Sequence, residues 1–124
     1  MRRDHRKLKA FELANDLVIQ VYDATRTFPK EEPFGPTSQI RRAAVSAPAN
    51  IVEGCGRRST RDFLRFRDLA HGSLRELGYL MGLARRLGYL TQSRADALVA
   101  LYEQASRVLA GLGRSLRAAP PDAT

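Results

Sequence analysis

The sequence predicts an all-α protein folded as an antiparallel up-down four-helix bundle. Apolar residues recur at steps of three and four along four separate stretches, and no stretch alternates apolar and polar residues as a strand does. The connecting segments are short and rich in proline, glycine or capping residues, which favours antiparallel neighbours. The 124 residues have the length of one domain, so we expect a single core within 1–124.

The first helix is expected near residues 8–28. Its apolar positions follow the helical period and are Phe11, Ala14, Val18, Val21, Tyr22 and Thr25. The following segment, 29–36, contains three prolines and a glycine, and these residues cannot continue a helix.

The second helix is expected from Thr37 or Ser38, either of which can cap it, to about Cys55. Pro48 lies inside this pattern and removes one backbone hydrogen bond, so we expect a kink between residues 44 and 48. Two glycines, at positions 54 and 56, then end the helix.

The third and fourth helices have recognisable ends. The segment 59–62, STRD, resembles a capping box with Asp62 in place of the usual glutamate, and Gly88 is the expected C-terminal cap of the third helix. Thr91 or Ser93 can begin the fourth helix, whose leucine-rich stripe extends to Leu116. Residues 118–124 are expected to be a disordered tail.

The chain is strongly basic, with 21 Lys and Arg against 13 Asp and Glu and a formal net charge of +8. This excess favours acidic partners such as nucleic acid. Arginine predominates, and its planar fork suits phosphate, although a GC-rich genome produces the same bias. A single cysteine permits no internal disulfide, and no signal peptide or membrane-spanning run is evident, so we expect a cytoplasmic protein that does not enter a membrane.

An arginine-rich face on the outside of the third helix is the candidate nucleic-acid-binding surface. Contacts with phosphates need positive charge but no base-specific code. The candidate residues are Arg57, Arg58, Arg61, Arg65, Arg67, Arg75, Arg85 and Arg86. The N-terminal segment 1–9 is a second basic cluster. For both clusters the alternative is a solvated charged surface without a partner.

A polar stripe on the second helix predicts a hydrogen-bond network with the third helix. Its members fall within a narrow arc when each residue turns about 100°. They are Gln39, Arg42, Ser46, Asn50 and Glu53, with Ser73 and Glu76 as partners on the third helix.

No residues form a recognisable catalytic or metal-binding constellation. Ser73 and Glu76 lack an accompanying histidine, and His71 lacks a second metal ligand. Arg57 is close enough to Cys55 in the sequence to lower the pKa of its thiol, but no histidine motif accompanies that cysteine. We therefore expect no enzymatic activity, cofactor or metal.

The segment SQIRRAAVSAPANIVEGCGR, followed by F-x-x-F and AHGSLRELGYL, resembles the four-helix-bundle proteins encoded by intervening sequences of bacterial 23S ribosomal RNA genes. The similarity covers Phe11 to about Leu90. The most specific positions are Gln39, Arg41, Arg42, Ser46, Pro48, Asn50, Glu53 and Gly54, and then Gly72, Ser73 and Glu76. The resemblance implies a homopentameric ring, and a relative in diversity-generating retroelements is thought to bind nucleic acid and a reverse transcriptase. Pro36, Ala47 and Arg67 depart from the family pattern.

These observations predict a non-enzymatic homo-oligomer, most simply a pentamer, that binds RNA or DNA through its arginine-rich surface. The alternative is a protein–protein interaction scaffold with weak or no nucleic-acid binding. Self-association is expected because apolar residues remain beside the core stripes of the second and third helices. These residues are Val45, Val52, Leu69, Leu80 and Leu83.

Overall fold

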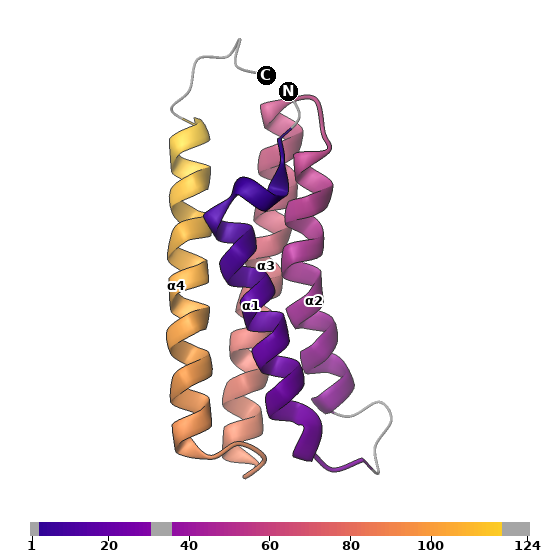
Figure 1. Ribbon diagram of the computed structural model, residues 1–124, viewed down its shortest axis with the longest axis vertical. Coiled ribbons are helices and arrows are strands. Elements are labelled where there is room, and N and C mark those ends of the chain that lie inside the picture. Colours follow the sequence, from indigo (N-terminus) through magenta and orange to yellow (C-terminus); the bar gives the residue numbers. More distant parts are fainter. Residues whose placement is uncertain (1–2, 31–35, 118–124) are drawn as a thin grey trace.

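The computed structural model describes residues 3–30 and 36–117, in which four α-helices lie side by side along one long axis (Figure 1). The helices are α1 (Lys9–Ala24), α2 (Pro36–Cys55), α3 (Thr60–Arg86) and α4 (Gln92–Arg117). Short 3-10 helices, η1 (His5–Lys7) and η2 (Thr25–Thr27), flank α1. The described ranges contain no strand, so the predicted all-α four-helix bundle is confirmed. The tail predicted to be disordered, residues 118–124, lies outside the described residues.

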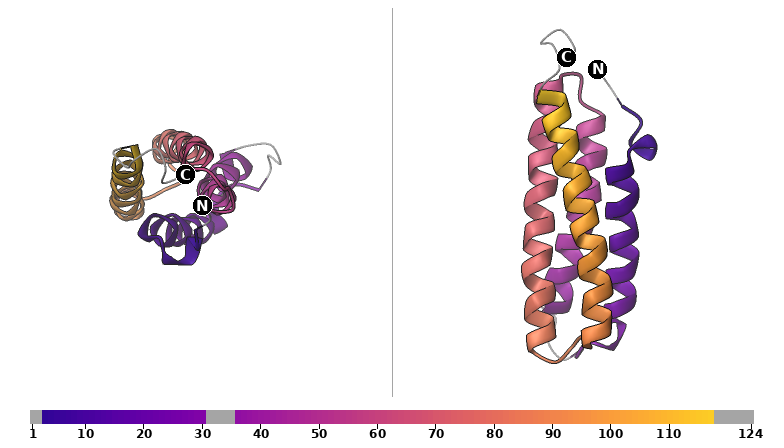
Figure 2. Two further views of the ribbon diagram at one scale, coloured as in Figure 1. Left: turned by 90° about the horizontal axis from the view of Figure 1, so that it is seen from above. Right: turned by 90° about the vertical axis from the view of Figure 1, so that its left-hand side faces the viewer.

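Each helix packs against its two neighbours around the bundle, with α1 beside α2 and α4, and α3 opposite α1 (Figure 2). Contacts join the end of α1 to the starts of α2 and α4. Arg41 near the start of α2 donates from Nε to Thr25 Oγ1, just after α1, at 2.8 Å, and Arg94 near the start of α4 pairs with Asp23 near the end of α1. These neighbouring helices therefore run in opposite directions.

The helix ends follow the local chemistry expected of them. Ser59 Oγ accepts a hydrogen bond from the Asp62 amide at 3.1 Å, which caps α3. Thr91 Oγ1 accepts from the Arg94 amide at 3.1 Å and caps α4 in the same way. Gly88 has φ +82°, a left-handed conformation that favours glycine and ends α3.

The core is a single cluster that draws on all four helices. α2 continues as a helix through Pro48, which is itself buried. Burial of the leucine and isoleucine side chains is the main stabilising term, about 1.5–3 kcal/mol for each fully buried chain. The most deeply buried large side chains include Leu17, Ile40, Leu74, Leu77 and Leu109.

Small residues let α2 and α3 approach closely, and this pair has the most extensive contact in the bundle. Ala43, Ala44 and Ala47 are buried on the inner face of α2. At the end of the helix, a Cβ atom on Gly54 would lie 2.9 Å from Cβ of Phe66, closer than two such carbons pack. Any larger residue at position 54 would therefore push the two helices apart.

Arg67 is buried, so the prediction that it shares the outer face of the third helix is wrong. Only 8% of the residue is exposed, because it lies at the edge of α3 that faces α4. Its Nη1 pairs with Asp68 Oδ1 at 3.2 Å, while its Nε has no hydrogen-bond partner among the described residues. The guanidinium lies against Gly113 of α4, where a Cβ atom would overlap it.

This contact predicts opposite effects for two glycines of α4. Replacing a helical glycine with alanine normally stabilises by up to about 1 kcal/mol. We expect Gly111→Ala to show that gain, because its new Cβ would meet only Arg114 Nη2 at 3.7 Å. Gly113→Ala should instead lower the free energy of unfolding by about 1 kcal/mol, because its methyl group displaces the flexible end of the buried Arg67 side chain.

Urea unfolding of the two variants provides the measurement. Adding Arg67→Ala to Gly113→Ala should recover part of the loss, since the overlapping group is then absent. Equal stabilisation by both alanines would show that Arg67 does not occupy the space beside Gly113.

Candidate nucleic-acid interface

The candidate arginines of α3 divide between the two ends of the bundle. Arg61 and Arg65 are exposed on the first turns of α3, Arg85 and Arg86 are exposed at its end, and Arg75 is exposed between them. The separation of the end groups is about 37 Å along the axis, because a helix rises about 1.5 Å per residue. They are therefore two surfaces rather than one continuous face.

The N-terminal segment adds to the first of these surfaces. The Arg3 amide donates to the Cys55 carbonyl at 2.9 Å, and the Arg3 guanidinium lies 4.8 Å from the centroid of the Phe63 ring. The two basic clusters that the sequence shows separately thus meet around the α2–α3 turn. We call this surface the basic end, and its cations are Arg3, Arg6, Lys7, Arg57, Arg58, Arg61 and Arg65.

Phe66 is an aromatic support for two cations of the basic end. The guanidinium carbons of Arg57 and Arg65 lie 4.7 Å and 4.5 Å from the centroid of its ring. Cation–π contact restricts both side chains while their charge remains at the surface. The Phe66 ring is itself buried between α2 and α3. The close approach at Gly54 therefore also determines where these two arginines lie.

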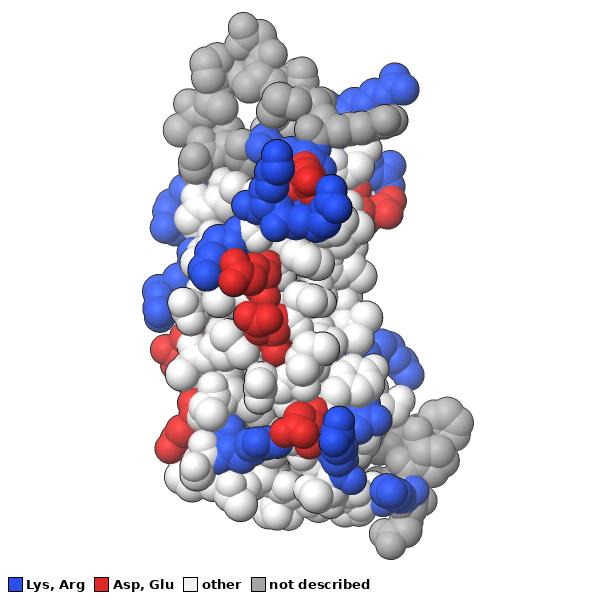
Figure 3. All heavy atoms as spheres, in the orientation of Figure 1, with Lys and Arg blue, Asp and Glu red and all other residues white. Residues whose placement is uncertain are grey.

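Three carboxylates reduce the charge of the basic end without cancelling it. Glu53 Oε1 accepts from Arg57 Nη2 at 2.6 Å, and Asp4 Oδ1 pairs with Arg6 Nε at 2.9 Å. The hydrogen bond from Arg6 lowers the pKa of Asp4 to about 2. With Asp62, the carboxylates number three against seven basic side chains. On the face drawn in Figure 3, basic side chains gather toward the two ends of the molecule.

Only part of the predicted polar network on α2 forms. Ser46 Oγ and Ser73 Oγ share a hydrogen bond of 2.8 Å, and Asn50 Nδ2 donates to the Ser46 carbonyl at 2.9 Å. Glu53 pairs with Arg57 instead of joining this group, and Arg42 Nη2 donates to Ser38 Oγ at 3.4 Å. Gln39 and Glu76 are exposed, and their side chains hydrogen-bond to no other described residue. The network therefore consists of three residues.

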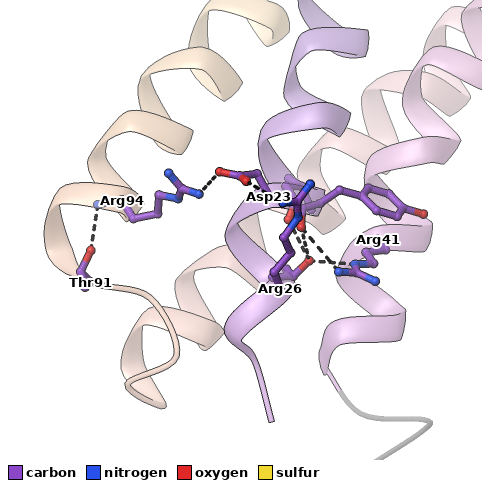
Figure 4. Close-up of polar contacts among 8 residues, drawn as sticks. Asp23, Arg26, Arg41, Thr91 and Arg94 are labelled. Atoms are coloured by element: carbon purple, nitrogen blue, oxygen red, sulfur yellow. Dashed lines mark hydrogen bonds and ion pairs between the residues drawn. The ribbon is translucent and has the colours of Figure 1, made fainter. Parts of the chain in front are cut away.

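A second polar cluster, which the sequence reasoning missed, lies at the opposite end of the bundle (Figure 4). Asp23 at the end of α1 pairs with Arg94 of α4 and lies 3.8 Å from Arg26 Nη1. Arg41 extends from α2 toward α1 and donates to Thr25 Oγ1. These residues are 16 and 71 positions apart in the sequence, so no local pattern indicates their contacts.

The second cluster borders a pocket of about 580 Å³ between η2 and the start of α2. We call it the cationic pocket. Its lining includes four basic side chains and two aromatic ones: Arg26, Lys30, Arg41, Arg42, Tyr22 and Phe28.

Two further reactive side chains, Cys55 and His71, lie in the described part of the chain. Cys55 is 2% exposed, and burial raises the pKa of its thiol, so the expectation that Arg57 lowers that pKa is wrong. Burial lowers the pKa of His71, and the positive charges of Arg67 and Arg75 lower it further.

In the described ranges, no three His, Cys, Asp or Glu side chains lie close enough to hold a metal ion. None of the helices described there is apolar enough over sufficient length to cross a membrane.

Comparison with known proteins identifies relatives of this chain. The family model described as 23S rRNA-intervening sequence protein matches residues 6–111, which extends the similarity to the start of α1 and into α4. A crystal structure of a protein of unknown function from the S23 ribosomal protein family, from Bacteroides thetaiotaomicron, has the same fold. It is 20% identical with a TM-score of 0.77, and the alignment covers 83% of this chain and 96% of that one. No curated protein matches the sequence of this chain.

The burial of Cys55 predicts low thiol reactivity in the folded protein. Only the thiolate attacks a disulfide reagent, and both burial and the raised pKa reduce its accessible amount. We expect labelling by Ellman's reagent at pH 8 to be slower by about two orders of magnitude in native buffer than in denaturant, because reaction requires local opening. Comparable rates in the two solutions would contradict the buried position.

Proposed function

Because the chain belongs to the family of 23S rRNA-intervening sequence proteins, we propose that it is a non-enzymatic, oligomeric helical-bundle protein that binds the phosphate backbone of RNA or DNA. The observation that carries the proposal is the basic end. There, two separate parts of the sequence bring seven basic side chains together around the α2–α3 turn. Charge concentrated in this way attracts a polyanion and is effective over about 8 Å at physiological salt.

The geometry favours backbone contact rather than base reading. Arg57 and Arg65 are held against Phe66, while Arg58 and Arg61 are exposed and unpaired within the described chain. Contacts of this kind fix a phosphate strand on the protein but carry no sequence information. We therefore propose binding with little sequence preference.

The middle of α3 fits this role less well. Arg75 shares the outer face with Asp68 and Glu76, so positive and negative groups alternate there. Tyr79, two turns before the helix ends, is 68% exposed and uncharged. We accordingly place the interface at the basic end rather than along the whole helix.

Self-association is supported by an exposed apolar surface on α1 and α2. Ile19 and Val45 are 61% and 42% exposed, and the Arg41–Thr25 contact places them at similar heights in the bundle. Val52, two turns further along the same side of α2, is 39% exposed. On the face drawn in Figure 3, the middle of α2 is largely uncharged, while acidic side chains follow α1. We propose that a second copy of the chain covers this surface.

The apolar residues expected to remain outside the core differ in their exposure and form three groups. Val45, Val52 and Leu69 are exposed, the last by 48%. Leu80 is 5% exposed and belongs to the core, so its predicted place at an interface is wrong. Leu83 is half-buried. The exposed candidates lie on two helices, Val45 and Val52 on α2 and Leu69 on α3. A head-to-tail ring would bring two different surfaces of neighbouring subunits together.

The second candidate function, a protein-interaction scaffold, rests on the same apolar surface. It would replace the nucleic-acid proposal if a different protein covers α1 and α2 and the basic end binds no nucleic acid.

The nucleic-acid proposal predicts salt-dependent binding that depends on the basic end. The logarithm of affinity should fall with the logarithm of salt concentration by roughly 0.7–0.9 per phosphate contacted. Arg58→Ala, Arg61→Ala and Arg65→Ala should each weaken binding about threefold to tenfold, for several oligonucleotide sequences alike, because each removes a charged hydrogen bond. Fluorescence anisotropy with labelled RNA and DNA measures these affinities.

Arg107→Ala is the matched control, since Arg107 is 71% exposed in its side chain on α4 and lies outside the basic end. It should change affinity less than twofold, roughly the effect of one distant screened charge. Each variant must retain the oligomeric state of the natural protein, because loss of avidity would also weaken binding. No binding at about 50 mM salt, where electrostatic attraction is strong, would exclude the proposal in favour of the scaffold.

Self-association predicts that a charge placed on the α1–α2 surface dissociates the oligomer. Val45→Glu should shift the mass measured by light scattering from a multiple of the protomer, five by family resemblance, toward 13.8 kDa, because an unpaired carboxylate would be buried at the interface. Val99→Glu on α4 is the control, because Val99 is 40% exposed and lies on another helix. A natural protein that is monomeric at micromolar concentration would contradict the prediction.

A further inference from the structure

We infer that the cationic pocket is a binding site for the phosphate groups of a nucleotide, separate from the basic end. The pocket lies between η2 and the first turns of α2, whereas the basic end surrounds the α2–α3 turn at the other end of the bundle. Three features support the inference: a preorganised arginine, an excess of positive charge, and an accessible aromatic ring.

Arg41 is the preorganised group. Its Nε donates to Thr25 Oγ1 at 2.8 Å, its Nη2 approaches the Tyr22 carbonyl at 3.5 Å, and its guanidinium carbon lies 4.6 Å from the centroid of the Tyr22 ring. Thr25 is in turn fixed, because its hydroxyl donates to the Val21 carbonyl at 2.9 Å. A guanidinium has five N–H donors, so Arg41 retains three that make no such contact and can bind an anion.

The described residues that line the pocket are rich in positive charge. They include Arg26, Lys30, Arg41 and Arg42 and no carboxylate. Glu31 and Glu32, which follow Lys30 in the sequence, lie outside the described residues, and the four cations exceed these two carboxylates in number. The nearest ion pair is between Arg26 and Asp23, at 3.8 Å, and Asp23 also pairs with Arg94. A neutral or cationic ligand would not offset four clustered cations, whereas a phosphate or pyrophosphate group would.

The size and the aromatic lining favour a nucleotide over inorganic phosphate. At about 580 Å³ the pocket lies within the usual range for small-molecule sites, about 300–1,000 Å³. Tyr22 is 41% exposed, so its ring has surface available to a planar base as well as to Arg41. The hydroxyl groups of Thr37 and Ser38 also line the pocket and can donate hydrogen bonds to phosphate oxygens.

Isothermal titration of the full chain with pyrophosphate, ADP, UDP and adenosine tests the inference. Pyrophosphate and both nucleotides should bind, the nucleotides more tightly, and adenosine should not, because the phosphates supply the charge that the pocket attracts. Arg41→Gln should weaken pyrophosphate binding about tenfold to a hundredfold, the effect of losing charge-assisted hydrogen bonds. Arg41→Lys should recover only part of the affinity, because lysine lacks the planar fork.

Arg107→Gln is the matched control and should leave the affinity within about twofold, since it removes the same charge from an exposed site on α4. A double variant, Lys30→Gln with Arg42→Gln, gives an independent readout because both side chains are exposed and their loss does not disturb the core. It too should weaken binding about tenfold. No pyrophosphate binding at millimolar concentration, or equal losses in Arg41→Gln and Arg107→Gln, would overturn the inference. Either result leaves the proposal for the basic end intact, because the two sites share no residue.

Discussion

The close approach of α2 and α3 is the constraint on which the basic end depends. Alanines line the inner face of α2, and Gly54 lets the helix backbone come within contact distance of Phe66. Phe66 is buried by that contact, and its ring then supports Arg57 and Arg65. A side chain at position 54 would therefore affect both packing energy and the position of two surface charges. Core packing and surface electrostatics are determined here by the same few atoms.

The two ends of the bundle collect cations by different means. At the basic end, a segment that precedes α1 packs on the α2–α3 turn, and aromatic rings hold the guanidinium groups. At the other end, hydrogen bonds to Thr25 and Tyr22 hold Arg41 beside a hollow surface. Exposed guanidinium groups held on aromatic side chains suit an extended polyanion, whereas a pocket suits a compact anion. The different ligands proposed for the two ends follow from this difference in shape.

The sequence predicted the helices well because their signals are local. Apolar periodicity, the Ser59 cap and Gly88 each act over a few residues, and the structure places the helix ends close to the expected positions. Arg67 was misplaced because it lies at the edge of the helical wheel, where the position of α4 decides between burial and exposure. Glu53 was assigned a partner on another helix although Arg57, four residues on, is the nearer cation. The cationic pocket depends on contacts between helices, which periodicity does not predict.

The proposed activities are compatible because they use different parts of the surface. The exposed apolar surface of Ile19, Val45 and Val52 lies between the two ends of the bundle, so self-association through it leaves both charged ends accessible. Rotational symmetry would then bring the basic ends of all subunits to one side of the ring. Each basic end has a modest excess of charge, but several copies on one face would bind a single strand at several points, and linked contacts increase affinity far beyond that of one site. Oligomerisation would in this way convert weak, sequence-independent phosphate contacts into stable binding.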